Sequence, residues 1–474
     1  MQNTNGISAR VADNRLALQS CFGNSFDIVL RDLMINRRPA LGLFADGMCD
    51  ELKIANAVLA PLLDRDAFYM PEHTAAQIGL FAFHGADMKK VHTVEEAAQQ
   101  ALSGAYVLFL EGESFAFSFG VQGYAKKSVE EPPGEQNEFG SQEGFTDHFK
   151  DNAALLRRKL KTPSLIIEHM TLGKTDNTSV LVCHLKGKAD EAMLRTVKKQ
   201  LKEAKLPAVL GSGWLRPFLH TGSANLFSGS GVTERPDLLA AKLSEGRIGI
   251  IADGTPFAVI VPYLFADYFH SLDDYLTTAA YALFIRILRY LCFFVAVGLP
   301  GVFVAVCVFH PKMLPTDIVF DIASAEARTP FPLMIEAITI HLIYEVVREA
   351  GLRMPRAVGH AVSIVGALVI GDAAVTAGLI AAPMLIVVGI TTIAGAVVSK
   401  LHDRIVVFRF VLILAGGLTG FFGVFLGLAF LFLQMCALNP FGLPFLFPFS
   451  PFSAEAQKDA VFRAPWKTLR NQKK

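Results

Sequence analysis

The chain has 474 residues, of which 52% are hydrophobic, and its formal net charge is +1. This length allows two or more domains, and the small net charge argues against a nucleic-acid-binding protein, because phosphate binding needs a concentrated basic face. The six cysteines form no CxxC pair. Their spacing therefore indicates no zinc or other metal site, and we expect no cofactor.

The first 20 residues contain no apolar core of the signal-peptide type, so they predict a cytosolic tail over residues 1–19 and a cytosolic region up to residue 262. Within that region, Thr93 is placed to cap a helix whose first turn carries Glu95 and Glu96. Short alternating runs predict strands at residues 27–33, 40–44, 106–110 and 115–119, and helices at residues 51–63 and 93–102.

An internal repeat runs through this region. Residues 101–112 resemble residues 242–254, with Gly104 on Gly246 and Gly112 on Gly254 at an offset of 142. Residues 41–47 resemble residues 181–187 at an offset of 140. The pattern predicts two similar α/β sub-domains, because such units bury a mixed sheet under helices. Convergent strand–turn–strand patterning is the alternative. The predicted bounds are 20–125 and 150–262, with a polar linker rich in Pro and Gly at 126–149.

The composition changes at residue 263, where aromatic and polar residues predict an amphipathic interface helix over 263–285. Residues 286–438 predict an all-α transmembrane domain of five or six helices, because one crossing takes about 20 apolar residues. Its densest stretch, residues 358–398, carries one formal charge and is long enough for two crossings that break at Ala381-Ala382-Pro383.

The last apolar block, residues 406–438, is either one long tilted helix or two helices that meet near residues 416–420. Lysine and arginine clusters favour the cytoplasmic side of a membrane. With two helices in this block the domain has six passes, and the basic tail at 439–474 is cytosolic. With one helix it has five passes, and that tail lies outside.

No nucleophile–base pair or phosphate-binding loop stands out, so we expect that the protein is not an enzyme. Charges in the apolar half are more informative, because a charge in hydrocarbon is costly and such groups usually pair or face water. For Glu345, a local ion pair with Arg348 competes with a place along a permeation path. Arg409 is a further charge of this kind. The pore or gating candidates are Glu336, Glu345, Asp372, Gly366 and Gly371.

Several linked motifs resemble those of the A subunit of GerA-type spore germinant receptors from endospore-forming bacteria. They include the boxes at 143–147, 233–237, 253–257 and 273–275, and an apolar box at 363–371. The motif residues are Glu143, Gly144, Phe145, Arg158, Glu234, Arg235, Pro236, Asp237, Asp253, Pro256, Arg348, Glu349 and Pro355.

The resemblance implies a multi-pass protein of the spore inner membrane that works with a transporter-like B subunit and a lipoprotein C subunit. It further implies a homo-oligomeric ring, with a pentamer as one option, that forms a nutrient-gated channel for monovalent cations. A SpoVAF-like ion-release amplifier that needs no B or C subunit is an alternative. A secondary transporter is another, although its repeats would lie among the membrane helices. A non-conducting scaffold is a fourth.

The chain also departs from the family's pattern. The family often carries arginines just before the glutamate of its first box, whereas here residues 139–142 read Phe-Gly-Ser-Gln. Where relatives often carry glutamine after the apolar box, this chain has Asp372.

Overall fold

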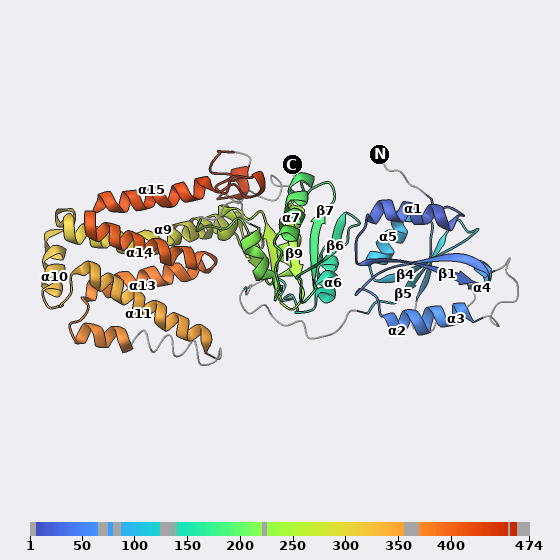
Figure 1. The fold of residues 1–474 in the computed structure, drawn as a ribbon, viewed down its shortest axis with the longest axis horizontal. Coiled ribbons are helices and arrows are strands. Elements are labelled where there is room, and N and C mark those ends of the chain that lie inside the picture. The colour runs from blue at the N-terminus through green and yellow to red at the C-terminus, as the bar shows by residue number, and fades with distance from the viewer. Residues whose placement is uncertain are drawn as a thin grey trace. The chain divides into compact units, whose positions relative to one another are not determined.

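The computed structural model describes residues 6–64, 74–78, 87–123, 135, 140–219, 225–354, 369–453 and 456–461. Its contacts divide the chain into two compact units (Figure 1). The α/β unit comprises Met1–Thr221, Ser228–Tyr263 and Pro440–Gly442. The helical unit comprises Gly222–Phe227, Leu264–Asn439 and Leu443–Lys474.

The α/β unit contains two antiparallel five-stranded sheets with the same topology. The first has the order β1-β2-β4-β5-β3 and the second β6-β7-β9-β10-β8. Their strands are β1 (Ile28–Ile35), β2 (Arg38–Ala45), β3 (Met88–Val91), β4 (Ala105–Leu110), β5 (Ala116–Gly120), β6 (Leu165–Leu172), β7 (Thr178–Leu185), β8 (Gly231–Thr233), β9 (Ile248–Ala252) and β10 (Ala258–Val261).

Helices cover both sheets. A helix over residues 51–63 has a π-helical centre, and the 3₁₀ segment Pro440–Gly442 (η9) also belongs to this unit. The helices are α1 (Val11–Phe22), α2 (Glu51–Lys53), η1 (Ile54–Leu59), α3 (Ala60–Leu63), α4 (Thr74–Ile78), α5 (Val94–Leu102), α6 (Phe149–Lys159), α7 (Glu191–Glu203), the 3₁₀ helix η4 (Ser212–Phe218) and α8 (Pro236–Ser244).

The structure shows the offsets that the sequence predicts. A shift of 140 residues carries the helix at 51–63 onto α7, and a shift of 142 carries α5 onto α8. Three pairs of glycines related by these shifts have positive φ, a conformation that glycine adopts without a steric penalty. The shared element order favours duplication over convergent patterning. The pairs are Gly47 and Gly187, Gly104 and Gly246, and Gly112 and Gly254.

The predicted helix cap and hairpin are confirmed. The Thr93 hydroxyl accepts a hydrogen bond from the backbone N–H of Glu96 at 3.1 Å, and β4 pairs antiparallel with β5. Side chains alternate across β4: Val107 packs toward α1 and α5, whereas Tyr106 and Leu108 pack toward the helix at 51–63. Figure 1 shows these two sets of helices on opposite faces of the first sheet. Both of its faces are therefore core.

A buried ion pair joins the two repeats. Arg157 of α6 is wholly buried, and its Nε and Nη2 atoms donate to the Asp27 carboxylate at 2.6 and 2.8 Å. Beside it, Ile167 of β6 donates its N–H to Ser25 Oγ at 3.0 Å and accepts from the Phe26 N–H at 2.7 Å. Removing one member of such a pair typically costs about 3–5 kcal/mol, because the other charge stays buried.

The helical unit is built around α9 (Ala279–Phe309), which packs along α13 and α14. Residues 369–376 are also helical. The other elements are the 3₁₀ turns η5 (Phe265–Phe269), η6 (Leu272–Tyr275), η7 (Pro311–Met313), η8 (Ser399–Leu401) and η10 (Ala456–Asp459), and the helices α10 (Thr316–Glu326), α11 (Leu333–Arg353), α13 (Ala382–Val397), α14 (His402–Thr419) and α15 (Phe421–Ala437).

Within the part of the chain that the structure describes, α9 alone is long and apolar enough to cross a membrane as a single helix. The pair Ala382–Val397 and Ser399–Thr419 passes the same test together, with a bend of 100° between its members. Helix α15 is apolar but shorter.

Two predicted breaks are present. Helix α13 begins at Ala382 with Pro383 in its first turn, and the last apolar block is two helices that meet at Gly420, where φ is +64°. The expected interface helix over 263–285 is absent. Two 3₁₀ turns and the start of α9 replace it, because Asp267 and Asp274 accept the N–H groups of Leu264 and Ser271 at 2.8 and 3.2 Å. Each turn is therefore capped as a separate element.

Glycines allow close helix packing between α9 and α14. A Cβ atom added to Gly301 of α9 would lie 2.6 Å from the Leu412 carbonyl oxygen, and one added to Gly416 of α14 would lie 2.5 Å from the Gly301 carbonyl oxygen. By contrast, Gly371 leaves 3.4 Å to Leu385, and Gly389 has no atom within 4 Å. The α9–α14 crossing thus uses glycines to bring two backbones together.

Candidate functional site: two polar networks in the helical unit

Glu336 lies in the first turn of α11 and is wholly buried. One carboxylate oxygen accepts a hydrogen bond from the backbone N–H of Ala381, the residue that precedes α13. Its Oε2 atom has no hydrogen-bond partner among the described residues. The carboxylate therefore sits at the positive end of the α13 dipole, with one oxygen available to a further donor or cation.

A second acid on the same helix, Glu345, contacts two arginines and a histidine. Arg348 Nε and His402 Nε2 lie 3.4 and 3.2 Å from its Oε2, and Arg409 Nη1 lies 3.6 Å from its Oε1. Arg409, on α14, is almost wholly buried and donates from Nε to the Ala296 carbonyl of α9 at 2.9 Å. Arg409 thus ties α9, α11 and α14 together.

His341 and Thr391 complete this seam of buried polar groups. His341 Nδ1 donates to the Ala337 carbonyl at 2.8 Å, and its Nε2 lies 3.4 Å from Thr391 Oγ1 on α13. Both side chains are wholly buried in an otherwise apolar cluster. We call the set Glu336, His341, Glu345, Thr391 and Arg409 the polar seam.

The pore and gating candidates have different surroundings. Asp372 is exposed on the helix at 369–376, and the neighbouring Gly371 is buried. Gly366 and Pro355 lie outside the described residues. The local pair of Glu345 with Arg348 is present, and Arg409 from another helix joins it. The sequence flagged the charge of Arg409 but could not supply its partner, because the two residues are far apart in the chain.

The family-motif residues of the α/β unit form one junction between loops. The Phe145 N–H donates to the Glu234 carbonyl at 2.7 Å, the Gly254 N–H donates to the Asp147 carbonyl at 2.8 Å, and Asp253 accepts the Phe149 N–H at 3.1 Å. Hydrogen bonds therefore connect the boxes at 143–147, 233–237 and 253–257, and Asp253 caps α6.

The remaining motif residues make local contacts. The Glu143 carboxylate lies 2.8 Å from both Arg158 Nη2 and Lys159 Nζ. Burial raises the pKa of Glu143, but these two cations together hold it below the usual range. Arg235 donates from Nε to Asp237 at the start of α8, at 3.0 Å. Of the others, Gly144 and Pro236 are buried, Pro256 is half-buried, and Glu349 pairs with Arg353 on α11.

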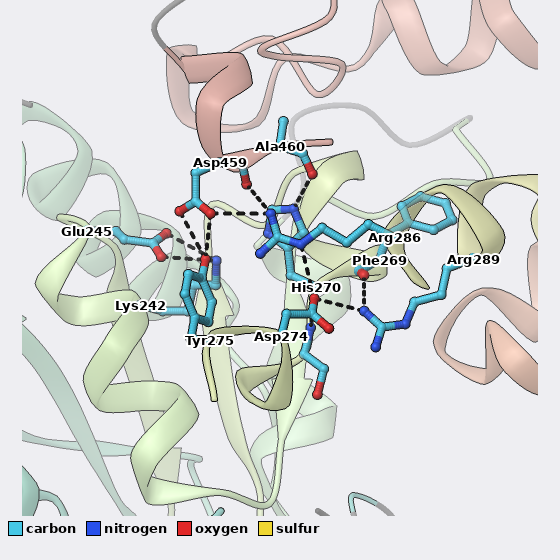
Figure 2. A network of polar contacts seen from close by, with 11 residues as sticks. Lys242, Glu245, Phe269, His270, Asp274, Tyr275, Arg286, Arg289, Asp459 and Ala460 are labelled. Carbon is cyan, nitrogen blue, oxygen red and sulfur yellow. Dashed lines mark hydrogen bonds and ion pairs between the residues drawn. The ribbon is translucent and has the colours of Figure 1, made fainter. Parts of the chain in front are cut away.

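The second polar network lies where α9 begins (Figure 2). Asp274 of η6 accepts from Arg286 Nε at 3.1 Å and from Arg289 Nη1 at 2.8 Å. Arg286 also donates from Nη1 to the carbonyl of Asp459 at 2.9 Å, and the Tyr275 hydroxyl donates to the Asp459 carboxylate at 2.9 Å. We call these five residues the α9 clamp.

Burial raises the pKa of Asp274, but the Arg289 and Arg286 guanidinium groups and the Ser271 N–H outweigh it, so the pKa lies below its usual value. The sequence marks Arg286 and Arg289 only as positive charges that precede an apolar run, and it indicates no role for Asp459. The motif at 273–275 was the signal that could have pointed to a partner for them.

A sequence model of the family described as "Bacillus/Clostridium GerA spore germination protein" matches residues 17–474. The chain belongs to the GerA spore germination protein family. Spore germination protein KA of Bacillus subtilis is 36% identical over 467 residues, which cover 97% of this chain and 85% of that protein.

Two further proteins of B. subtilis are similar to this chain over nearly its whole length. The uncharacterized membrane protein YfkQ of B. subtilis is 36% identical over 98% of this chain and 90% of its own length. Spore germination protein B1 of B. subtilis is 31% identical over 97% of this chain and 95% of its own length.

Among solved structures, the chain is similar to the N-terminal domain of the A subunit of the Bacillus megaterium spore germinant receptor GerK3. The identity is 26% and the TM-score 0.44, over 56% of this chain and 99% of that one.

Proposed function

We propose that this protein is the A-type subunit of a spore germinant receptor whose helical unit lies in a membrane and provides a path for monovalent cations. The match to the family over residues 17–474 supports the receptor assignment. The observation that carries the ion path is Glu336, a buried acid in an apolar helical unit whose Oε2 has no hydrogen-bond partner among the described residues. A negative group along a path favours cations through electrostatics.

The exterior of the helical unit supports a membrane location. Helix α15 exposes Phe422, Phe425 and Leu433 by about two thirds each, and α9 exposes Phe284 and Leu291 by more than half. Large apolar side chains exposed to this degree fit lipid or another membrane subunit better than they fit water.

The α9 clamp supports an even number of membrane crossings. Asp459 follows the last apolar helix and contacts Arg286 near the start of the first. The start of α9 and the segment after α15 therefore lie at the same end of the helical unit. In a membrane both would be on one side, which favours six passes over five and the same, cytoplasmic side for the tail and the N-terminal region.

In this proposal, copies of the chain assemble into a ring, and transporter-like B and lipoprotein C subunits supply the response to nutrient. The GerA family relationship supports such partners in general. The polar seam lies inside one copy of the chain, so each copy contributes its own Glu336.

Potassium efflux from lipid vesicles that contain the full-length protein tests the ion path. We expect efflux above that of empty vesicles. Glu336→Gln should lower it by about tenfold, the lower end of the range by which a focused charge raises local ion concentration.

Glu349→Gln is the matched control, because Glu349 lies on the same helix but is largely exposed and pairs locally with Arg353. Its efflux should match that of the wild type. Efflux from the Glu336→Gln protein equal to that of the wild type would contradict a role of Glu336 in the ion path.

A further inference from the structure

The segment that follows the last apolar helix makes polar contacts with Arg286 of α9 and with the turns that precede α9 (Figure 2). Arg286 Nη1 donates to the Asp459 carbonyl at 2.9 Å and lies 3.3 Å from its carboxylate. The Tyr275 hydroxyl lies 2.9 Å from both carboxylate oxygens, and His270 Nε2 donates to the Ala460 carbonyl at 2.7 Å. Residues 456–461 are thus attached to Arg286, Tyr275 and His270 through two neighbouring residues, Asp459 and Ala460.

The two acids of the α9 clamp differ in burial. The Asp274 side chain is 3% exposed and holds both Arg286 and Arg289, whereas the Asp459 side chain is 36% exposed. If the tail segment left, Arg286 would keep Asp274 as its partner. No buried charge would then be left without a partner. A buried charge without a partner is what makes the loss of a buried ion pair costly. The contact of Asp459 is of the partly exposed, low-energy kind.

The helix held by this contact is the central one of the unit. Helix α9 packs along α13 and α14, and its Ala296 carbonyl accepts the hydrogen bond from Arg409 in the polar seam. The close glycine crossing at Gly301 also lies on α9. A displacement of the first turns of α9 would therefore be transmitted to the seam through a rigid helix.

We propose that residues 456–461 form a releasable latch that holds α9 in a non-conducting position, and that release of Asp459 from Arg286 and Tyr275 favours conduction. The inference rests on the proposed ion path, because it names a regulator of that path. It is an autoinhibitory contact within one chain: the buried Asp274 keeps the arginines in place, and the outer Asp459 is the part that exchanges.

The test compares Asp459→Asn with the wild-type full-length protein in potassium-loaded vesicles without any nutrient. Hydrogen exchange of the amides in residues 456–461 is followed in the same samples. Asparagine keeps the size of the side chain but removes its charge. We expect faster exchange in this segment and an unstimulated efflux raised by up to about fivefold, the ratio that corresponds to an exposed ion pair.

Two variants make the comparison specific. Asp403→Asn is the matched control, because Asp403 is also in the helical unit and is largely exposed. Within the described part of the chain, its one ion pair is with Arg404 at 3.6 Å. It should leave both readouts unchanged. Tyr275→Phe removes the hydroxyl that donates to Asp459. It should change both readouts in the same direction as Asp459→Asn, by a smaller factor.

The outcomes separate the latch from the ion path. A wild-type protein that conducts, with Asp459→Asn equal to it in efflux, would overturn the latch and leave the path standing. Faster exchange without higher efflux would also overturn it as a regulator. If neither protein conducts, the ion path itself is contradicted. A wild type with low efflux, beside an Asp459→Asn protein with up to about fivefold higher efflux, would support both proposals.

Discussion

Charged residues of the apolar half could be located from the sequence, but their partners could not. Glu336 and Arg409 stand out because each interrupts an apolar run. Their contacts come from elsewhere: Ala381 reaches Glu336 from the start of α13, and Ala296 reaches Arg409 from α9. Such pairings depend on how helices cross, which a single sequence does not encode in its spacing.

The pH dependence of local stability can be predicted for Glu143. Because its folded pKa is lowered, its stabilising contribution is complete above the unfolded value near 4.5 and is lost as the pH falls through the folded value. Glu143→Gln should therefore speed hydrogen exchange in α6 at pH 7, by an amount worth about 1 kcal/mol or less for a partly exposed pair.

At a pH below the folded pKa, the wild type and the Glu143→Gln protein should exchange alike when they are compared at the same pH. Glu191→Gln serves as the control, because Glu191 is almost fully exposed and pairs only with Arg195 at 3.6 Å among the ion pairs of the described residues. A Glu143→Gln difference that persists unchanged in acid would contradict the assigned cause.

At the scale of elements, local signals predicted the α/β region well. Its strands alternate, its turns carry glycine where φ is positive, and Thr93 has the geometry of a helix cap. The same reasoning failed over residues 263–285, where an amphipathic period was present but the acids cap two separate turns instead. Periodicity alone does not show which side chains compete for backbone N–H groups.

Glycine-mediated packing of α9 on α14 gives a prediction at this scale. Valine at Gly301 or Gly416 would place side-chain atoms against a carbonyl oxygen of the other helix. Each substitution should lower the stability of the helical unit by about 1–3 kcal/mol, the usual cost of overpacking. Thermal unfolding in detergent measures it.

Gly389→Val is the matched control, because no heavy atom lies within 4 Å of a Cβ built at that position. It should unfold within about 0.5 kcal/mol of the wild type, as most surface substitutions do. Equal losses at Gly389 and Gly301 would contradict the close crossing.

For the whole molecule, the division into an α/β part and an apolar helical part could be read from composition, and the repeat from its offsets. The assignment of Pro440–Gly442 to the α/β unit and of Gly222–Phe227 to the helical unit could not. Phe441 of the first segment packs in the core of the second sheet, and Phe227 of the other packs among the helices. Both contact residues far away in the chain, so neither segment has a local signature.

The most direct test of the α9 clamp and the even number of crossings is a measurement of which side of the membrane each end of the helical unit lies on. The full-length protein carries a cleavable tag at its N-terminus and another at its C-terminus, and protease is added outside sealed vesicles. A third tag, inserted at residues 311–313 just beyond α9, is the internal control. We predict that the two terminal tags are cut together or protected together, and that the third behaves oppositely. Cleavage of one terminal tag while the other is protected would contradict the α9 clamp and the even number of crossings.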